Sequence, residues 1–233
     1  MKRIGLIGGV SPESTVVYYQ LLNQAARRAL GGDHSADIVI HSLDFGVMHQ
    51  LYDAADWDGF TAKVASAARG LEAADCELIA ISSNTTQVAA EASAAAVDAP
   101  FVFLIDALAD AIRAKGAARP LLLGTRFVME GHFYRPTLQE RFGIDCVTPS
   151  EPDRAEVDRI IFEELSLGAI RDASRARFLE IIERGRDAGA DSAILGCTEF
   201  NLFDCPSRTE TPLFDTTLIH AAAIARAAYG EPA

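Results

Sequence analysis

Short apolar runs alternate with amphipathic helical patterns along the whole chain, and this alternation limits the fold more than any other feature. The strand-like runs are, in chain order, RIGLIGG, DIVIHSLDF, LIAISS, FVFLI, PLLLGT, DCVTPS, SAILGC and PLFDTT. Helices are expected over residues 13–30, 57–73, 85–94, 106–115, 130–142, 153–167, 174–188 and 218–229. Uninterrupted apolar strands joined by helices are typical of parallel sheets covered on both faces. The pattern predicts an α/β protein that binds its ligand at the carboxyl ends of the strands.

An internal repeat divides this pattern into two halves. The run RIGLIG from Arg3 returns as RPLLLG from Arg119, an offset of 119 − 3 = 116, and a second match sets Ser83 against Cys197, an offset of 197 − 83 = 114. Chance recurrence of Gly and aliphatic residues at strand ends is the alternative explanation. We expect two pseudo-symmetric parallel-sheet α/β halves with the active site in the cleft between them. The expected halves are 1–115 and 116–210, with 211–233 packing back on the first.

Composition narrows the classes of partner. The chain has 21 Lys and Arg against 33 Asp and Glu, a net charge of −12, which argues against nucleic acid and anionic membranes as partners. No apolar run approaches the roughly 18 residues that a membrane span needs. The N-terminal residues lead directly into a strand-like run and lack a secretory h-region, so we expect a cytoplasmic location and a small-molecule ligand.

Cys197 is the candidate reactive thiol. It ends the run SAILGC and is followed by the polar Thr198 and Glu199, an unfavourable setting for a core cysteine. Amide dipoles at a strand end favour a thiolate, so we expect its pKa to lie below the usual value of about 8.5. A buried structural cysteine is the alternative. Cys76, Cys146 and Cys205 lack such a setting and are expected to be inert.

The segment Ser82–Gln87 places six hydrogen-bonding side chains after the strand LIAI. Backbone N–H groups of Asn84 and Thr85 at the start of the next helix would hold a carboxylate. Capping of that helix by Ser or Asn is a simpler explanation, and the two are compatible.

Two further strand ends carry candidate ligand contacts, Ser11 after GLIGG and Thr125 followed by Arg126 after PLLLG. Ser11 is also the expected N-cap of the first long helix, with Pro12 at its first position. The glycine spacing matches neither a dinucleotide fingerprint nor a P-loop, which argues against NAD and ATP. The three lysines lack the apolar surroundings of a Schiff-base lysine, and the five histidines lack metal-ligand spacing. We therefore expect neither pyridoxal phosphate nor metal.

These motifs resemble those of the aspartate/glutamate racemase family. The resemblance rests on IGLIGG followed by SPEST, on SNT near residue 83, on LGTRF at 123–127 and on GCTE at 196–199, and it covers nearly the whole chain. It implies a cofactor-independent isomerase, a cytoplasmic homodimer, in which two cysteines act on opposite sides of the substrate Cα. One cysteine removes the proton and the other returns it.

The chain departs from the family pattern where the first cysteine is expected, because it has Ser83 there and Gln87 in place of a histidine. The resemblance then implies an L-preferring variant with Cys197 as the main base and Ser83 on the proton-returning side. Ser11, Asn84, Thr85, Thr125, Thr198 and Glu199 complete the expected substrate site. Alternatives are a one-cysteine decarboxylase, another isomerase of the same superfamily, or a non-catalytic protein that binds small acids.

Overall fold

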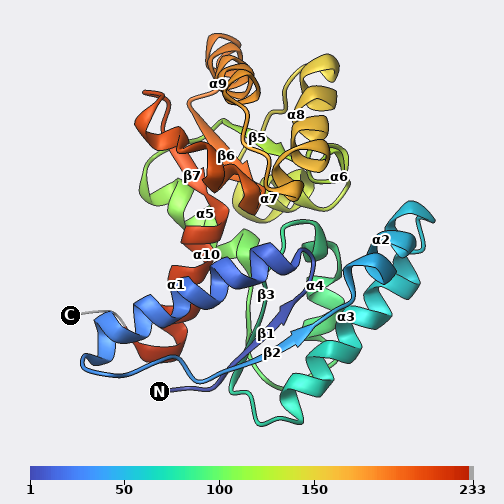
Figure 1. Cartoon of the computed structure of the whole chain (residues 1–233), viewed down its shortest axis with the longest axis vertical. Coiled ribbons are helices and arrows are strands. Elements are labelled where there is room, and N and C mark those ends of the chain that lie inside the picture. The colour runs from blue at the N-terminus through green and yellow to red at the C-terminus, as the bar shows by residue number, and fades with distance from the viewer. Residues whose placement is uncertain (231–233) are drawn as a thin grey trace. The chain divides into compact units, whose positions relative to one another are not determined.

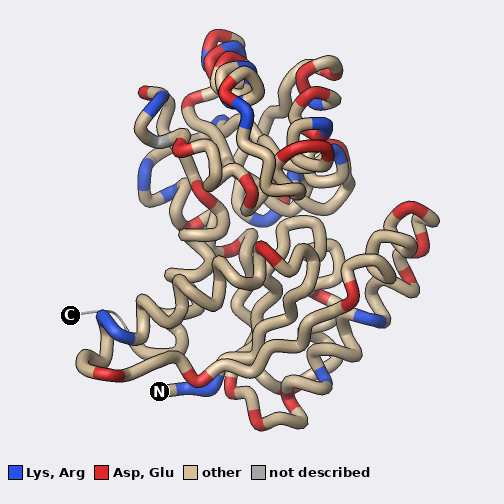
Figure 2. Tube along the Cα trace, viewed as in Figure 1, with Lys and Arg blue, Asp and Glu red and all other residues tan. Residues whose placement is uncertain are grey.

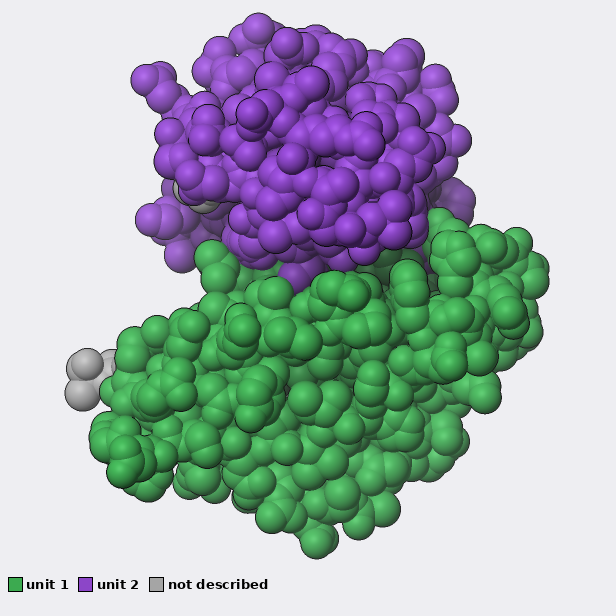
Figure 3. Space-filling view, in the orientation of Figure 1, with its two compact units in different colours: residues 1–107, 217–233 green, residues 108–216 purple. Residues whose placement is uncertain are grey.

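The computed structural model describes residues 1–230, which form two compact units (Figures 1 and 3). The first unit comprises Met1–Ala107 together with the chain from Thr217 onward, and the second comprises Leu108–Thr216. Each unit is a parallel sheet with flanking helices, so the expected α/β fold class is confirmed.

The first unit has a four-stranded sheet in the order β2-β1-β3-β4. Its strands are β1 (Ile4–Gly8), β2 (Ile38–Ser42), β3 (Leu78–Ile81) and β4 (Phe101–Val102). Its helical elements are α1 (Pro12–Leu30), α2 (Phe45–Asp53), α3 (Trp57–Glu72), the 3₁₀ helix η1 (Thr85–Ala89), α4 (Ala90–Ala94), the start of α5 (Leu104–Ala114) and nearly all of α10 (Thr216–Tyr229). One core cluster joins the sheet to α1 and α10, and a second joins its other face to α3.

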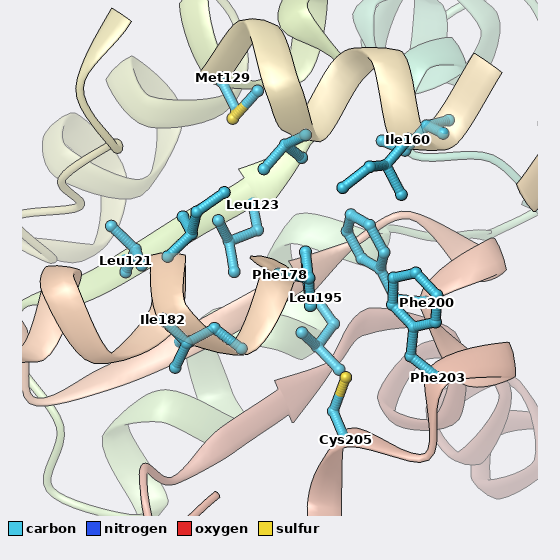
Figure 4. Close-up of a cluster of buried hydrophobic side chains, with 14 of the residues drawn as sticks. Leu121, Leu123, Met129, Ile160, Phe178, Ile182, Leu195, Phe200, Phe203 and Cys205 are labelled. Carbon is cyan, nitrogen blue, oxygen red and sulfur yellow. The ribbon is translucent and has the colours of Figure 1, made fainter. Parts of the chain in front are cut away.

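The second unit has the strand order β5-β6-β7, formed by β5 (Pro120–Gly124), β6 (Ser192–Gly196) and β7 (Leu213–Asp215). Its helices are α6 (Arg126–Glu130), α7 (Tyr134–Phe142), α8 (Glu151–Glu163) and α9 (Asp172–Asp187), with 3₁₀ turns η2 (Leu165–Leu167), η3 (Thr198–Phe203) and η4 (Cys205–Ser207). Figure 4 shows its core, where Leu123 and Leu195 from the sheet meet Phe178 of α9 and Phe200 of η3.

The two sheets share one topology, which supports the duplication. In each unit the first strand lies inside the sheet and pairs with the third strand-forming segment on one side, β1 with β3 and β5 with β6. On the other side β1 pairs with β2, and β5 forms a single bridge from Leu121 to Val147. In the second unit the segment DCVTPS therefore contributes one bridge rather than the predicted strand.

Three other element predictions were wrong in part. Helix α2 follows β2 directly, because the Asp44 side chain accepts from Val47 N at 3.0 Å and caps a helix inside the run read as strand. The run FVFLI is extended only through Val102, since α5 begins at Leu104. The helix expected over 130–142 is replaced by α6 and α7, which are separated at Gly131, a residue with extended backbone.

Within residues 1–230 no helix has the length and apolar character needed to cross a membrane.

Candidate active site

Strands β5 and β6 each end in a glycine, at a point where a side chain would not fit. Gly124 and Gly196 are register partners, and a Cβ atom on Gly196 would lie 2.7 Å from the carbonyl oxygen of Leu123. A Cβ atom on Gly124 would lie 2.9 Å from a methyl group of Val128. Neither position has room for a side chain, so the first side chain that can project beyond the end of β6 is that of Cys197.

Cys197 is half-buried, and its thiol is paired with a carboxylate. The S–H group of Cys197 donates to Oε2 of Glu199 at 2.9 Å. Glu199 follows Thr198 in the first turn of η3. A sulfur–oxygen distance of this length is that of a hydrogen bond in which the thiol, a weak acid, donates and the carboxylate accepts. The structure therefore assigns Glu199 a contact with the thiol, whereas the sequence suggested only a contact with substrate.

The expectation of a lowered pKa for Cys197 was wrong. Burial of the thiol raises its pKa well above the usual value, and the Glu199 carboxylate raises it further through charge and through the hydrogen bond to the S–H group. Asp158 adds a smaller effect in the same direction. A nearby backbone hydrogen bond lowers the pKa but does not outweigh these effects. Together these effects favour the protonated form of the Cys197 thiol.

Ser83 lies at the matching strand end in the first unit, after β3, and is buried. Its Oγ accepts two hydrogen bonds, from Thr86 N at 3.3 Å and from Thr86 Oγ1 at 3.0 Å. The first of these caps η1, so the capping role expected for this segment is present. Because both acceptor positions of the oxygen are used, the remaining function of the Ser83 hydroxyl is to donate its proton.

The side chain of Gln87 fixes the backbone around Ser83 through two hydrogen bonds. Gln87 Nε2 donates to the carbonyl oxygens of Ile81 and Ser83, at 3.2 and 3.0 Å. Asn84 is buried and Thr85 half-buried at the start of η1. Gln87 thus fixes the backbone of the loop, a role that sequence reasoning missed.

Ser11 caps α1 as expected, accepting from Ser14 N at 3.3 Å. The first turn of α1 also contacts the end of β3, because Ser14 Oγ donates to the carbonyl oxygen of Ser82 at 3.1 Å and Thr15 Oγ1 lies 3.4 Å from Ser82 Oγ. Thr15 additionally accepts from Gly9 N at 2.8 Å. These bonds bring Ser11 and the Ser83 segment to one edge of the sheet. Thr15 was not singled out from the sequence. Its position four residues after the predicted N-cap Ser11 was the signal that could have identified it.

Thr125 is the N-cap of α6, where its Oγ1 accepts from Val128 N at 3.3 Å, and it follows Gly124 as predicted. The neighbouring Arg126 is committed to carboxylates, with Nη2 lying 3.3 Å from Glu151 and Nε 3.8 Å from Glu130. Its backbone N–H donates to Asp158 Oδ1 at 2.6 Å. Arg126 therefore makes a poor partner for an acidic substrate.

The other three cysteines are buried free thiols, consistent with the inert role predicted for them. Burial raises the pKa of Cys146 to about 12 and that of Cys205 to about 11. In the described part of the chain no group of three or more His, Cys, Asp or Glu side chains is arranged to hold a metal ion.

The sequence and the fold of this chain are similar to those of known racemases. A family model described as Asp/Glu/Hydantoin racemase matches residues 7–224. A crystal structure from Yersinia pestis, provisionally described as an Asp/Glu racemase, is 42% identical with a TM-score of 0.92 and covers 98% of this chain and 99% of its own. An aspartate racemase homologue from Pyrococcus horikoshii is 34% identical with a TM-score of 0.86, again covering 98% and 99%.

A more distant structure, glutamate racemase from Francisella tularensis in complex with D-glutamate, shares the fold at 15% identity, with a TM-score of 0.66 and coverage of 94% of this chain and 78% of its own. The family match spans almost the whole chain, and the two nearer structures match it end to end. The chain belongs to the Asp/Glu/Hydantoin racemase family.

Proposed function

We propose that the protein is an amino-acid racemase, independent of pyridoxal phosphate, that exchanges the Cα proton of aspartate- or glutamate-type substrates. The observation that carries this proposal is the 2.9 Å hydrogen bond from the Cys197 thiol to the Glu199 carboxylate at the end of β6. A thiol with an adjacent proton acceptor is suited to reversible proton transfer at carbon.

In the proposed first step Glu199 takes the thiol proton, so that the S–H bond breaks and an O–H bond forms on Oε2. The substrate ammonium group favours this transfer, because a nearby cation stabilises the thiolate. The sulfur lone pair then takes the Cα proton, and the electron pair of the C–H bond remains on the substrate as a carbanion. This order corrects the simpler scheme in which Cys197 is a thiolate from the start.

Ser83 supports a second, unequal role in this scheme. Its oxygen already accepts two hydrogen bonds from Thr86, and an alcohol is a much weaker acid than a thiol. We propose that Ser83 returns a proton to the carbanion, directly or through water. Its O–H bond breaks, a C–H bond forms on the substrate, and the oxygen regains through solvent the proton that Glu199 took from Cys197. Removal of the Cα proton in the reverse direction follows the same path and is slow, because a serine hydroxyl is a poor base. Abstraction is therefore faster from one enantiomer, which we take to be L.

The remaining predicted contacts hold the substrate in this proposal. Backbone N–H groups of Asn84 and Thr85 and the polar side chains of Ser11, Thr125 and Thr198 are the proposed partners of the α-carboxylate. Preorganised donors of this kind stabilise the carbanion, because proton transfer by a positioned group supplies only about 10² to 10⁴-fold of rate. We also propose that the protein acts in the cytoplasm as a homodimer.

The raised pKa of Cys197 also fits one other function. A neutral thiol at rest is suited to protonating a carbanion on a single face, as in a one-cysteine decarboxylase acting on a malonate-type acid. Proton exchange and carbon dioxide release distinguish the two reactions. A non-catalytic binding protein would show neither.

The test incubates the protein in D₂O with L- and D-aspartate and L- and D-glutamate, and follows the Cα proton by NMR. We expect loss of the Cα proton signal, faster from one enantiomer, with eventual formation of both enantiomers. Carbon dioxide release from a substituted malonate without exchange would favour the decarboxylase. Ligand-induced thermal stabilisation with neither reaction would leave only a binding function and would overturn the proposal.

A further inference from the structure

The outer edge of β2 is open along its whole length. Strand β2 pairs with β1 on one side, and no described strand pairs with it on the other. The bonds from Ile4 N to Asp37 O and from Leu43 N to Gly8 O show that the odd-numbered residues of this segment bond to β1. Because alternate residues of a strand bond to the same neighbour, the N–H and C=O groups of Ile38, Ile40 and Ser42 point outward.

Three features by which monomeric proteins protect a sheet edge, namely lysine, proline and a bulge, are absent from this edge. Residues 38–43 include no lysine and no proline, and the register with β1 runs without a bulge from Ile38 to Ser42. An exposed, regular and apolar edge strand is a template for pairing with another chain. The unpaired N–H and C=O groups on the outer side of β2 can therefore form hydrogen bonds with a strand of another chain.

Apolar side chains of α1 lie beside this edge. Asn23 Oδ1 accepts from Ala36 N at 3.1 Å, which fixes α1 against the segment entering β2. Tyr19 and Val16 lie one and two turns earlier on the same side of α1 and are 49% and 55% exposed. The rise of the helix places these two side chains beside the part of β2 that contains Ile40, which is 37% exposed. Together, Val16, Tyr19, Ile40 and the outer edge of β2 form what we call the α1/β2 face.

The α1/β2 face is also free of net charge, in a chain of net charge −12. No Asp, Glu, Lys or Arg occurs between Glu13 and Arg27 on α1 or between Asp37 and Asp44 around β2, and Figure 2 shows both elements in tan over most of their length. Asp37 is paired with Arg3 at 3.1 Å, and Asp44 caps α2. A second acidic copy can therefore approach this face without bringing charges of the same sign together.

We infer that the α1/β2 face binds a second copy of this chain, with the two β2 strands antiparallel about a two-fold axis at Ile40. In that register Ile40 faces Ile40 of the partner subunit, and Ile38 of each chain faces Ser42 of the other. All outward groups of the three residues then pair, which gives about six main-chain hydrogen bonds. The two four-stranded sheets become one continuous sheet, with Tyr19 and Val16 packing across the axis.

This inference names the surface for the homodimer in the proposed function, and its test is independent of catalysis. Sedimentation velocity and light scattering of the purified protein at micromolar concentration give its mass. We expect a dimer, and at least a tenfold weaker association for Tyr19→Glu, because two carboxylates meet across the axis. Leu167→Glu is the matched control, since Leu167 is 76% exposed in the other unit, and it should remain dimeric.

A backbone test distinguishes strand pairing from simple apolar contact. Ile40→Pro removes an N–H group that does not bond to β1, so it should abolish the dimer and leave the far-UV circular dichroism and melting temperature of the monomer near those of Tyr19→Glu. Ile40→Val keeps the N–H group and should stay dimeric. A monomeric parent protein, or a dimer that survives Tyr19→Glu or folded Ile40→Pro, overturns the inference.

Disulfide trapping tests the register and remains informative if Ile40→Pro fails to fold. In a Cys197→Ala background, oxidised Ile40→Cys should form a covalent dimer, because facing residues in a hydrogen-bonded pair lie about 5.5 Å apart at Cα, within disulfide range. Ser42→Cys places the two thiols about 14 Å apart along the strand and should not cross-link. Equal trapping of both variants, or of neither, contradicts this register.

Discussion

Ser83 and Cys197 occupy the same position in their respective sheets. Leu78 pairs with Ile4 at the start of β1, and Ser192 pairs with Pro120 at the start of β5. Ser83 lies 83 − 78 = 5 residues after the first pairing and Cys197 lies 197 − 192 = 5 residues after the second. Each is followed within two residues by a 3₁₀ helix, η1 or η3. The duplication thus places a hydroxyl in one unit at the position where the other has a thiol.

The Glu199 carboxylate raises the pKa of Cys197 and also accepts its proton, so Glu199→Gln separates the two effects. We predict that the thiol pKa falls in this variant, because the negative charge is lost, while Cα proton exchange slows by about 10²-fold, because the proton acceptor is lost. The pH dependence of alkylation by iodoacetamide reports the pKa, and NMR in D₂O reports exchange. Faster alkylation with unchanged exchange would remove Glu199 from the proposed mechanism.

Ser83→Cys installs a thiol at the position equivalent to Cys197. If the L-enantiomer is the substrate that Cys197 deprotonates, this variant should raise the rate of Cα proton exchange from the D-enantiomer more than from the L-enantiomer, because a thiolate is a far better base than a serine hydroxyl. The equilibrium constant between the enantiomers remains one. Ser83→Ala serves as the comparison. Activity of Ser83→Ala equal to the parent with both enantiomers would reduce Ser83 to its capping bond with Thr86.

His220 on α10 makes the first unit sensitive to acid. Its ring is fully buried, with Nε2 lying 2.9 Å from the carbonyl oxygen of Val102 and Nδ1 3.0 Å from the Tyr18 hydroxyl. Since Nε2 must donate to the carbonyl, Nδ1 accepts from Tyr18 and the ring is neutral. Burial lowers the pKa of His220 to about 4, from a usual value near 6.5.

The sign of the pH effect follows from these values. Below pH 6.5 the unfolded chain binds a proton at this residue that the folded chain refuses until about pH 4, so stability is lost as the pH falls through this window. We predict a decrease in the free energy of unfolding of about 2 kcal/mol between pH 7.5 and pH 5. Urea titrations at the two pH values measure it, and His220→Gln should remove most of the difference. Four carboxyl groups also have lowered pKa values, but they lose their contribution to the free energy of unfolding only at lower pH. They are those of Asp153, Glu156, Glu164 and Asp191.

Periodicity and repeat were sufficient to predict the α/β class and the shared position of Ser83 and Cys197, because strand ends and glycines are local signals. The same signals could not show that α2 starts at Asp44, since an N-cap directly after a strand has the same polar-after-apolar pattern as a loop. They also gave the wrong direction for the pKa of Cys197. That direction depends on burial and on the orientation of the Glu199 side chain, which only the folded structure provides.

Deuterium incorporation at Cα by the parent protein and by Cys197→Ser tests the central claim most directly. Cys197→Ser keeps the size and a hydrogen-bond donor to Glu199 but replaces the thiol by a much weaker acid. We predict deuterium incorporation from aspartate or glutamate by the parent and none by Cys197→Ser, with unchanged melting temperature and circular dichroism. Exchange by Cys197→Ser at the rate of the parent would contradict the assignment of Cys197 as the proton-transferring group.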